Sequence, residues 1–422
     1  MTVAILTDEE VVLHDVPRLT DVDNLVSLLE ALGCEVGSSK SNGAGCGQTL
    51  RLRVSDPTTD TAEYDIVRRM RATFNVLGPM LARRGKAVVS MPGGCNIGDR
   101  PVDLHLRGLS ALGARIELDG GYIHATVPDS GRLHGARVFL GGSMGPTVTG
   151  TANVMSAATL AEGTTIIESA ACEPEIVDLA DLLNRMGACI RGAGTPRLTI
   201  DGVESLHGAE HTVIADRIEA GTYIMAAAVT NGDVIIDNCP LDALTAALDR
   251  LVEIGVEVDP VAGGDDRPGA AAQPALGMSQ SVRVASRRRL NPITVTTQPH
   301  PGFPTDLQAQ IMVLLAMADG NSIITEKVFP DRFLHVAELL RMGANLVRNG
   351  SSVLISGVRD LIGAPVMASD LRASAGLVLA GLGARGVTTI NRVYHIDRGY
   401  EKMEVNLRNL GARIERVNRP AV

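Results

Sequence analysis

Six copies of one short pattern run through this chain, and each is a helix-like run that ends in an apolar residue, a glycine and a small or β-branched residue. The six glycines recur every 68 to 88 residues and are Gly33, Gly113, Gly187, Gly255, Gly343 and Gly411. Self-similarity at a spacing of this size is typical of one supersecondary module used repeatedly. The pattern therefore predicts an architecture assembled from six copies of the same unit.

The third copy shows the unit most completely. Residues 151–163 read as a small-residue helix ended by glycine, and the β-branched residues 164–169 predict a strand. Residues 175–187 place apolar side chains at helical spacing, and a hairpin follows over 188–191 and 197–200. The unit is thus helix, strand, helix and hairpin, with one more strand leading into the next helix.

The first copy departs from this unit. Its first strand reads VVLHDV, and before the LTDEE that matches the end of the first helix stand only residues 1–5. Five residues make about one helical turn. We therefore expect the first copy to lack its leading strand and the start of its first helix.

The length of 422 residues allows about two or three domains, and two domains of three copies each is the natural division of the repeat. We expect domains over 1–213 and 214–422. Residues 262–280 are rich in glycine, alanine and proline, and we expect a surface loop that interrupts the hairpin of the fourth copy.

The composition excludes several classes of protein. A net charge of −9, 2% aromatic residues and no tryptophan argue against a nucleic-acid partner. No two of the six cysteines form a CxxC motif, and no two histidines have the spacing of metal ligands, so we expect no metal site. With neither a signal peptide nor an apolar run of about 18 residues, the chain reads as a reduced cytoplasmic protein without a membrane contact.

Five arginines stand at the predicted starts of helices in equivalent positions of the repeat: Arg100, Arg217, Arg332, Arg372 and Arg398. Helix N-termini already favour anions, so added arginines predict a phosphate-rich substrate held between the two domains. The alternative for any single one is a surface arginine paired with a neighbouring aspartate.

Cys95 lies in a glycine-rich loop, PGGC, next to one of these basic helix starts. That setting favours a thiolate or a thiol that donates a proton. The alternative is a small buried residue in a loop, since buried cysteine is common.

Seven longer motifs stand out, and five of them contain these residues: PGGCNIGDRPVDLH, TLAEGTTIIESAACEPEIVD, DRIEAGT, PHPGFPTDLQAQ, DRFLHVAELLRMGA, DLRASAGLVLAG and YHIDRGYEKMEVNLRNLGA. Together they resemble the UDP-N-acetylglucosamine 1-carboxyvinyltransferases (enolpyruvyl-UDP-GlcNAc synthases) of the enolpyruvyl transferase family, from Met1 to about Arg416 apart from 262–280. The resemblance implies the enolpyruvyl transferase fold, an α/β protein of two inside-out α/β barrel domains built from six repeats, with the first repeat truncated.

The resemblance also implies a reaction and its residues. The enolpyruvyl group of phosphoenolpyruvate passes to the 3′-hydroxyl of UDP-N-acetylglucosamine, without a cofactor, in the committed step of bacterial peptidoglycan synthesis. Cys95 is then the general acid, which can also become covalently modified, Asp306 handles the hydroxyl proton, and Arg100 and Arg398 clamp phosphoenolpyruvate. The UDP-sugar contacts are Arg71, Arg100, Pro101, Val102, Asp103, Leu104, Thr147, Val148 and Val328, and the cleft residues are Arg332, Asp370 and Arg372.

The chain departs from this family in two places. Gly145 and Pro146 stand where some members carry a lysine and a hydrophobic residue. The catalytic Lys-Asn pair of the family precedes the first helix, in the segment that the first copy lacks, and Lys40 and Asn42 do not replace it. We therefore expect slow turnover or none from the chain as written. A non-catalytic UDP-sugar-binding paralogue, or a true start upstream of Met1, remains an alternative reading.

Overall fold

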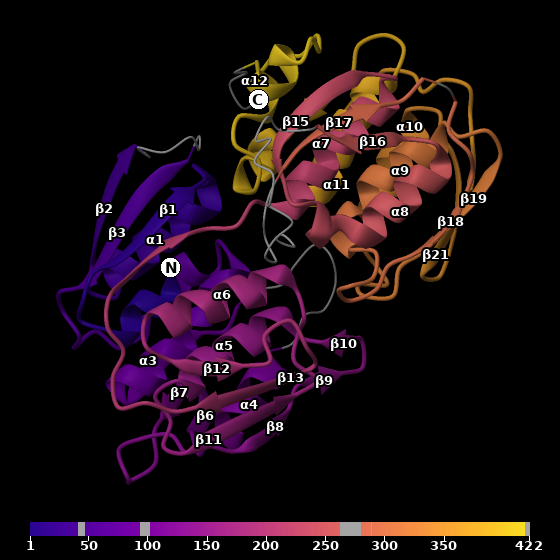
Figure 1. Cartoon of the computed structure of the whole chain (residues 1–422). Helices are drawn as coiled ribbons and strands as arrows, with labels where there is room; N and C mark the ends of the chain where they lie inside the picture. Colours follow the sequence, from indigo (N-terminus) through magenta and orange to yellow (C-terminus); the bar gives the residue numbers. More distant parts are fainter. Residues whose placement is uncertain (41–46, 93–101, 262–279, 288, 418–422) are drawn as a thin grey trace, which may run out of the picture. The chain divides into compact units, whose positions relative to one another are not determined.

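The computed structural model describes residues 1–40, 47–92, 102–261, 280–287 and 289–417 (Figure 1). The described residues up to Ile214 form one compact unit, and those from Ala215 onward form a second. Cys95, Arg100, Pro101 and Asn42, together with most of the 262–280 segment, lie outside the described residues.

The first unit alternates short helices with short strands. Its helices are η1 (Thr2–Leu6), α1 (Thr20–Ala31), α2 (Tyr64–Val67), η2 (Arg71–Val76), α3 (Leu77–Arg84), α4 (Asp103–Ala111), α5 (Val148–Ala158) and α6 (Pro174–Arg185). Its strands are β1 (Val11–Val16), β2 (Cys34–Lys40), β3 (Gln48–Val54), β4 (Thr61–Ala62), β5 (Lys86–Ser90), β6 (Arg115–Asp119), β7 (Tyr122–Thr126), β8 (Arg137–Phe139), β9 (Gly141–Gly142), β10 (Gly145–Pro146), β11 (Thr164–Glu168), β12 (Cys189–Arg191), β13 (Arg197–Asp201) and β14 (Ala209–Thr212).

The second unit repeats the same alternation. Its helices are α7 (Arg217–Val229), η3 (Leu241–Leu244), α8 (Thr245–Ile254), η4 (Thr305–Leu307), α9 (Gln308–Ala316), α10 (Leu334–Arg341), α11 (Leu371–Gly383), η5 (Val393–Arg398) and α12 (Met403–Asn409). Its strands are β15 (Asp233–Cys239), β16 (Glu257–Pro260), β17 (Gln280–Ala285), β18 (Thr294–Thr296), β19 (Asn321–Thr325), β20 (Asn345–Asn349), β21 (Ser352–Ser356), β22 (Pro365–Met367) and β23 (Thr389–Asn391).

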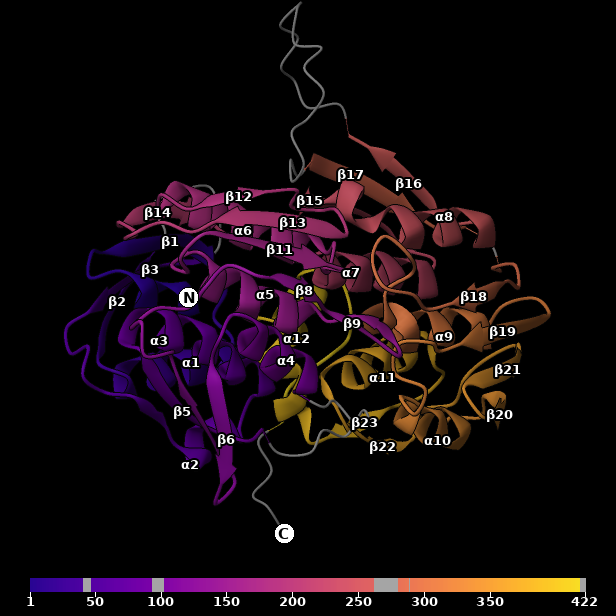
Figure 2. The ribbon, with the colours of Figure 1, turned by 90° about the horizontal axis from the view of Figure 1, so that it is seen from below.

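The sheets reproduce one plan. A leading strand runs parallel to the first strand of a repeat, which pairs antiparallel with the repeat's hairpin, as in the order β18-β19-β21-β20 (Figure 2). The same four-stranded plan recurs as β4-β5-β7-β6 and as β8-β11-β13-β12. The strand, helix and hairpin predicted for the third copy are β11, α6 and the β12–β13 pair, so that prediction is confirmed.

The helices that begin each repeat lie inside, and the sheets lie around them. Every residue of α9 is buried, and α7, α9 and α11 contact one another within the second unit (Figure 1). In the first unit α5 is buried from Gly150 to Ala158 and contacts both α3 and α4. A helix that is apolar on all sides has to be enclosed, which explains why these helices are rich in alanine, leucine and glycine.

The repeat glycines end their helices in the left-handed conformation. All six have positive φ, from 81° at Gly33 to 99° at Gly255. At Gly187 the next residue, Ala188, donates its N–H to the carbonyl of Leu183 at 3.0 Å, which closes the helix end. Only glycine adopts this backbone without strain, so the repeat is a set of identical helix stops.

No strand precedes η1 among the described residues, as expected of the truncated first copy, but β1 is not left without a parallel neighbour. Strand β14, which follows the third repeat, pairs in parallel with β1, with Val11 opposite Ala209. The first sheet therefore has the order β14-β1-β3-β2, because the chain returns after three repeats and closes the unit on itself. The shortened first helix is confirmed as η1, a single 3₁₀ segment whose residues from Val3 to Leu6 are buried.

Candidate active site

Asp306 lies on η4, which continues directly into α9. Pro304 precedes η4 with an extended backbone, so the chain turns into the helix just before Asp306. The dipole of the helix favours an acidic side chain in this first turn. The sequence PTDLQ thus presents a carboxylate at the start of a buried helix.

Three arginines surround the carboxylate of Asp306. Arg332 donates from Nη1 to Oδ1 at 2.6 Å, and Nε of Arg372 lies 3.6 Å from Oδ2. Arg217, the first residue of α7, adds a third positive charge. Burial alone raises the pKa of Asp306, but the arginines outweigh burial and hold that pKa well below its ordinary value. Asp306 is therefore ionised at neutral pH, with 39% of its side chain accessible.

The guanidinium of Arg372 is largely buried, with 12% of the side chain exposed. Within the described part of the chain, its Nε and Nη1 have no hydrogen-bond partner. Buried guanidinium donors with unused capacity are suited to bind a phosphate, carboxylate or hydroxyl group. Arg372 and Asp306 together therefore offer a cation and a carboxylate to one polar ligand.

Two aspartates hold the helices that carry these arginines. Asp370 caps α11, because its Oδ1 accepts from the backbone N–H groups of Arg372 at 3.0 Å and Ala373 at 3.1 Å. Asp216 caps α7 in the same way. These carboxylates satisfy the free donors of the helix ends and fix the direction in which Arg217 and Arg372 leave their helices.

A buried polar cluster supports Arg372 from its other side. The guanidinium lies 5.4 Å from the ring centre of Tyr400, whose hydroxyl is 2.9 Å from Oγ1 of Thr222. Gln310 donates to the same Oγ1 at 3.1 Å. The cluster joins residues of α7, α9 and the segment before α12, so it holds Arg372 against three parts of the unit.

Arg398 ends η5, five residues before α12, and is half-buried rather than at a helix start. Burial and the nearby charge of Arg398 lower the pKa of His395, while Asp370 raises it. Arg398, His395 and Asp370 are therefore close in space at the N-terminal end of α11. The structure brings these residues and the Asp306 cluster together on one unit.

The predicted contacts of the first unit gather at helix starts. Arg71 begins η2, while Asp103 and Leu104 begin α4 after Val102. Thr147 caps α5 by accepting from the backbone N–H of Gly150 at 3.1 Å, and Val148 is the first helical residue. Gly145 and Pro146 form β10, which pairs with β9 just before this cap.

A buried histidine joins these helix starts. Nε2 of His105 on α4 lies 3.2 Å from Oγ1 of Thr149 on α5, and its Nδ1 lies 3.1 Å from Nδ2 of Asn153. Asn153 also accepts from the backbone N–H of Gly78 at 2.6 Å and donates to the carbonyl of Phe74 at 3.2 Å. The starts of α4 and α5 are thus held to each other and to η2 and α3.

Sequence reasoning missed the buried polar residues beneath the site. These residues are Thr222, Gln310, Tyr400 and His335, and all four lie within the motifs quoted above. Burial lowers the pKa of His335 to about 4. For Thr222 and Gln310 the available signal was a polar residue on a helix that is otherwise largely apolar. Glu326, which is fully buried after β19, had no comparable signal.

Neither a metal-binding cluster nor a membrane-spanning helix is found among the described residues. No three histidine, cysteine, aspartate or glutamate side chains among them are placed to hold a metal ion. Among the helices of these residues, none has the length and apolar character that a membrane span requires.

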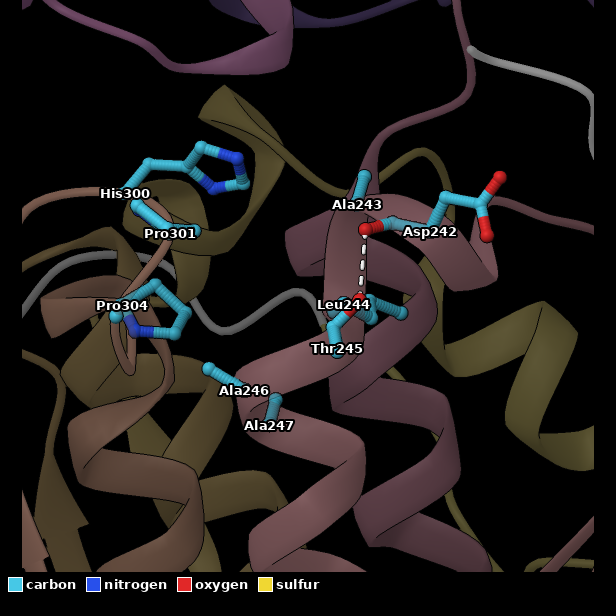
Figure 3. Close-up of a pocket in the computed structure, with 10 residues that line it drawn as sticks. Asp242, Ala243, Leu244, Thr245, Ala246, Ala247, His300, Pro301 and Pro304 are labelled. Carbon is cyan, nitrogen blue, oxygen red and sulfur yellow. Dashed lines mark hydrogen bonds between the residues drawn. The ribbon is translucent and has the colours of Figure 1, made fainter. Parts of the chain in front are cut away.

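A small cavity lies between the start of α8 and the loop that contains His300, Pro301 and Pro304 (Figure 3). Two of its lining residues are joined by the hydrogen bond that Thr245 donates to the carbonyl of Asp242 at 3.0 Å. The cavity measures about 50 Å³ and contains none of the predicted site residues. Ligand sites for nucleotide-sized molecules are about 300–1,000 Å³, so this cavity is not a candidate substrate site.

Comparison with known proteins places this geometry in context. Residues 1–407 match the family model of EPSP synthase (3-phosphoshikimate 1-carboxyvinyltransferase). A UDP-N-acetylglucosamine 1-carboxyvinyltransferase of Anaeromyxobacter sp. (strain Fw109-5) is 51% identical over 413 residues, which cover 98% of this chain and 92% of that protein. One from Paracoccus denitrificans (strain Pd 1222) is 49% identical over 423 residues, which cover 100% of this chain and 93% of that protein.

Solved structures confirm the fold predicted from the sequence. The enolpyruvyl transferase NikO from Streptomyces tendae has a TM-score of 0.81 at 24% identity, covering 97% of this chain and 92% of its own. EPSP synthase from Acinetobacter baumannii has a TM-score of 0.71 at 16% identity, covering 98% and 94%. The arrangement of buried helices inside sheets is thus the enolpyruvyl transferase fold.

Proposed function

The chain belongs to the EPSP synthase (3-phosphoshikimate 1-carboxyvinyltransferase) family, and we propose that it transfers the enolpyruvyl group of phosphoenolpyruvate to the 3′-hydroxyl of UDP-N-acetylglucosamine, releasing phosphate. Relatives that are 49% and 51% identical to this chain over nearly their whole length are named for this activity, which supports the choice of acceptor. The same reaction is the committed step of peptidoglycan synthesis, so the proposal places the protein in cell-wall formation in the cytoplasm.

The observation that carries the proposal is the Asp306 carboxylate held between Arg332 and Arg372. Phosphoenolpyruvate brings a phosphate and a carboxylate, and UDP-N-acetylglucosamine brings a diphosphate, so both substrates need preorganised cations. A hydroxyl that has to react also needs a nearby acceptor for its proton. Asp306 and its arginines provide both functions within one cluster.

The reaction needs only a weak base at Asp306. The 3′-oxygen bonds to C2 of phosphoenolpyruvate while C3 takes a proton, which we assign to Cys95. Bond formation makes the attacking hydroxyl strongly acidic, so its proton passes to Asp306 even though the arginines lower the pKa of this carboxyl. Phosphate then leaves with the electron pair of its bond to C2, C3 loses a proton, and the enolpyruvyl ether forms.

The remaining residues divide between the two substrates in this proposal. Arg100 and Arg398 hold phosphoenolpyruvate, and Arg332, Asp370 and Arg372 line the reaction site. The UDP-sugar contacts are Arg71, Arg100, Pro101, Val102, Asp103, Leu104, Thr147, Val148, Asp306 and Val328. The half-buried position of Arg398 and the helix starts at Asp103 and Thr147 support these roles.

Product analysis tests the proposal. The protein is incubated with phosphoenolpyruvate and UDP-N-acetylglucosamine, and the nucleotide sugar is examined by mass spectrometry and proton NMR. The proposal predicts a UDP-sugar that carries an enolpyruvyl ether at O3′. Tight binding of UDP-N-acetylglucosamine without any such product would instead favour a UDP-sugar-binding protein that does not catalyse.

A further inference from the structure

Glu326 is a completely buried carboxylate that follows β19. No ion pair joins it to any residue that the structure describes, so hydrogen bonds have to compensate for its burial. Both of its oxygens accept such bonds. Burying a carboxyl group costs free energy, and the hydrogen bonds that offset this cost also fix the positions of the groups that donate them.

The donors to Glu326 come from three separate segments. Oε1 accepts from Oγ1 of Thr297 at 2.6 Å and from the backbone N–H groups of Val328 at 2.8 Å and Phe329 at 2.9 Å. Oε2 accepts from Oγ1 of Thr305 at 2.8 Å. Glu326 thus ties the end of β18, the start of η4 and the turn after β19 to one side chain.

Two of these segments carry residues of the proposed acceptor site. Thr305 directly precedes Asp306, and the turn contains Val328. Because the Thr305 hydroxyl donates to Glu326, its lone pairs remain for Nη1 of Arg332 at 3.1 Å. The same Nη1 donates to Asp306 at 2.6 Å, so the orientation of Thr305 helps to set the orientation of the catalytic ion pair.

We propose that Glu326 is a positioning residue for the UDP-sugar side of the reaction, which holds Asp306 and Val328 in register through Thr305 and the turn. The inference rests on the proposed function, since it takes UDP-N-acetylglucosamine as the ligand of Asp306 and Val328. Glu326 itself touches neither substrate. Its contacts lie on the acceptor side and not at Arg398, so its loss affects the two substrates unequally.

The experiment is steady-state kinetics of Glu326→Gln with each substrate varied. The amide preserves size but presents a donor to groups that all donate. Losing charge-assisted bonds that fix the site raises the KM for UDP-N-acetylglucosamine and lowers kcat, each on the order of tenfold, with the KM for phosphoenolpyruvate within about twofold of the original value. Loss of folded protein alone would lower kcat and leave both KM values unchanged.

Two further variants keep the test decisive even where Glu326→Gln folds poorly. Thr305→Val removes the link to Arg332 and is expected to raise the same KM selectively. Ser322→Ala removes a buried bond from the backbone N–H of Ile293, away from the turn and from Asp306, and is expected to lower the melting temperature without changing either KM. The double variant of Glu326→Gln with Thr305→Val should be no worse than the worse single variant.

The outcomes separate this inference from the proposed function. Product formation by the unsubstituted protein, with both KM values unchanged or raised equally in Glu326→Gln and Thr305→Val, overturns the positioning role alone. No product from the unsubstituted protein overturns both.

Discussion

Nη1 of Arg332 lies 2.6 Å from Oδ1 of Asp306 and 3.1 Å from Oγ1 of Thr305, and only 8% of the Arg332 side chain is exposed. An ion pair buried to this extent holds both partners in one orientation. Asp331, the neighbour of Arg332 in the sequence, instead makes an exposed pair with Arg348 at 2.8 Å. Adjacent residues thus divide between the site and the surface.

Asp306→Asn is expected to lower turnover by about 10²–10⁴, because the amide preserves shape but cannot accept the hydroxyl proton. The measurement is kcat for phosphate release at saturating substrates. Asp331→Asn is the matched control, since its carboxylate is 79% exposed and exposed pairs contribute little. Similar kcat values for the two variants would contradict the role of Asp306.

Arg332→Gln is expected to raise the pKa of Asp306, because one of the charges that lower it is removed. Asp306 has to be ionised to accept a proton, so activity in the variant should be lost at a higher pH than in the unsubstituted protein. The pH dependence of kcat/KM below neutrality measures this shift. An acidic limb at the same pH in both proteins would show that Arg332 does not tune Asp306.

Much of the fold could be predicted from the sequence because the repeat encodes it locally. The glycine at each helix end needs a left-handed backbone, and six such stops define the six units. The arginines Arg217 and Arg372 do begin helices, as the repeat predicts, and both approach Asp306. Position in the repeat therefore pointed to two of the three arginines beside Asp306, whereas Arg332 lies two residues before α10.

Other features depend on long-range pairing and had no local signal. The pairing of β14 with β1 joins residues almost 200 positions apart, and nothing in either strand encodes that partner. Arg398 ends a 3₁₀ helix instead of beginning an α-helix, because α12 starts only at Met403. Glu326 reads as an ordinary acidic residue until its burial is known.

Selective alkylation should label Cys95 first among the six thiols. Cys34 and Cys239 are buried, and burial raises the pKa of Cys34 and Cys172 and that of Cys239 to about 11. Thiols with raised pKa values react slowly, because the thiolate is the nucleophile. Iodoacetamide at limiting concentration followed by peptide mapping measures the order. Preferential labelling of Cys34 or Cys189 would contradict the assignment of Cys95.

Glu219 should make the protein less stable as the pH rises from about 4.5 to about 7. Burial, reinforced by Asp216, raises the pKa of Glu219 from 4.5 to about 7, so the folded protein retains a proton that the unfolded chain releases. Stability therefore falls across this interval and levels off above it. Glu219→Gln lacks this loss, which amounts to at most about 3 kcal/mol.

Urea unfolding at about pH 5 and about pH 8 gives the change in the free energy of unfolding between the two pH values, which is then compared between the variant and the unsubstituted protein. The fall in the free energy of unfolding between the two pH values should be smaller in Glu219→Gln than in the unsubstituted protein. Glu253→Gln, at a side chain that is 48% exposed, should behave like the unsubstituted protein. An equal fall in all three proteins would show that Glu219 ionises normally in the folded state.

The choice of acceptor is the central claim, since the matching family model is named for 3-phosphoshikimate, whereas the relatives from Anaeromyxobacter and Paracoccus are named for UDP-N-acetylglucosamine. The direct measurement is the rate of phosphate release from phosphoenolpyruvate with each acceptor in turn and with none. Because the chain as written is expected to turn over slowly, our account predicts slow release that still exceeds background with UDP-N-acetylglucosamine, and background release with shikimate 3-phosphate. Phosphate release that requires shikimate 3-phosphate, or that has the same rate with and without UDP-N-acetylglucosamine, would contradict it.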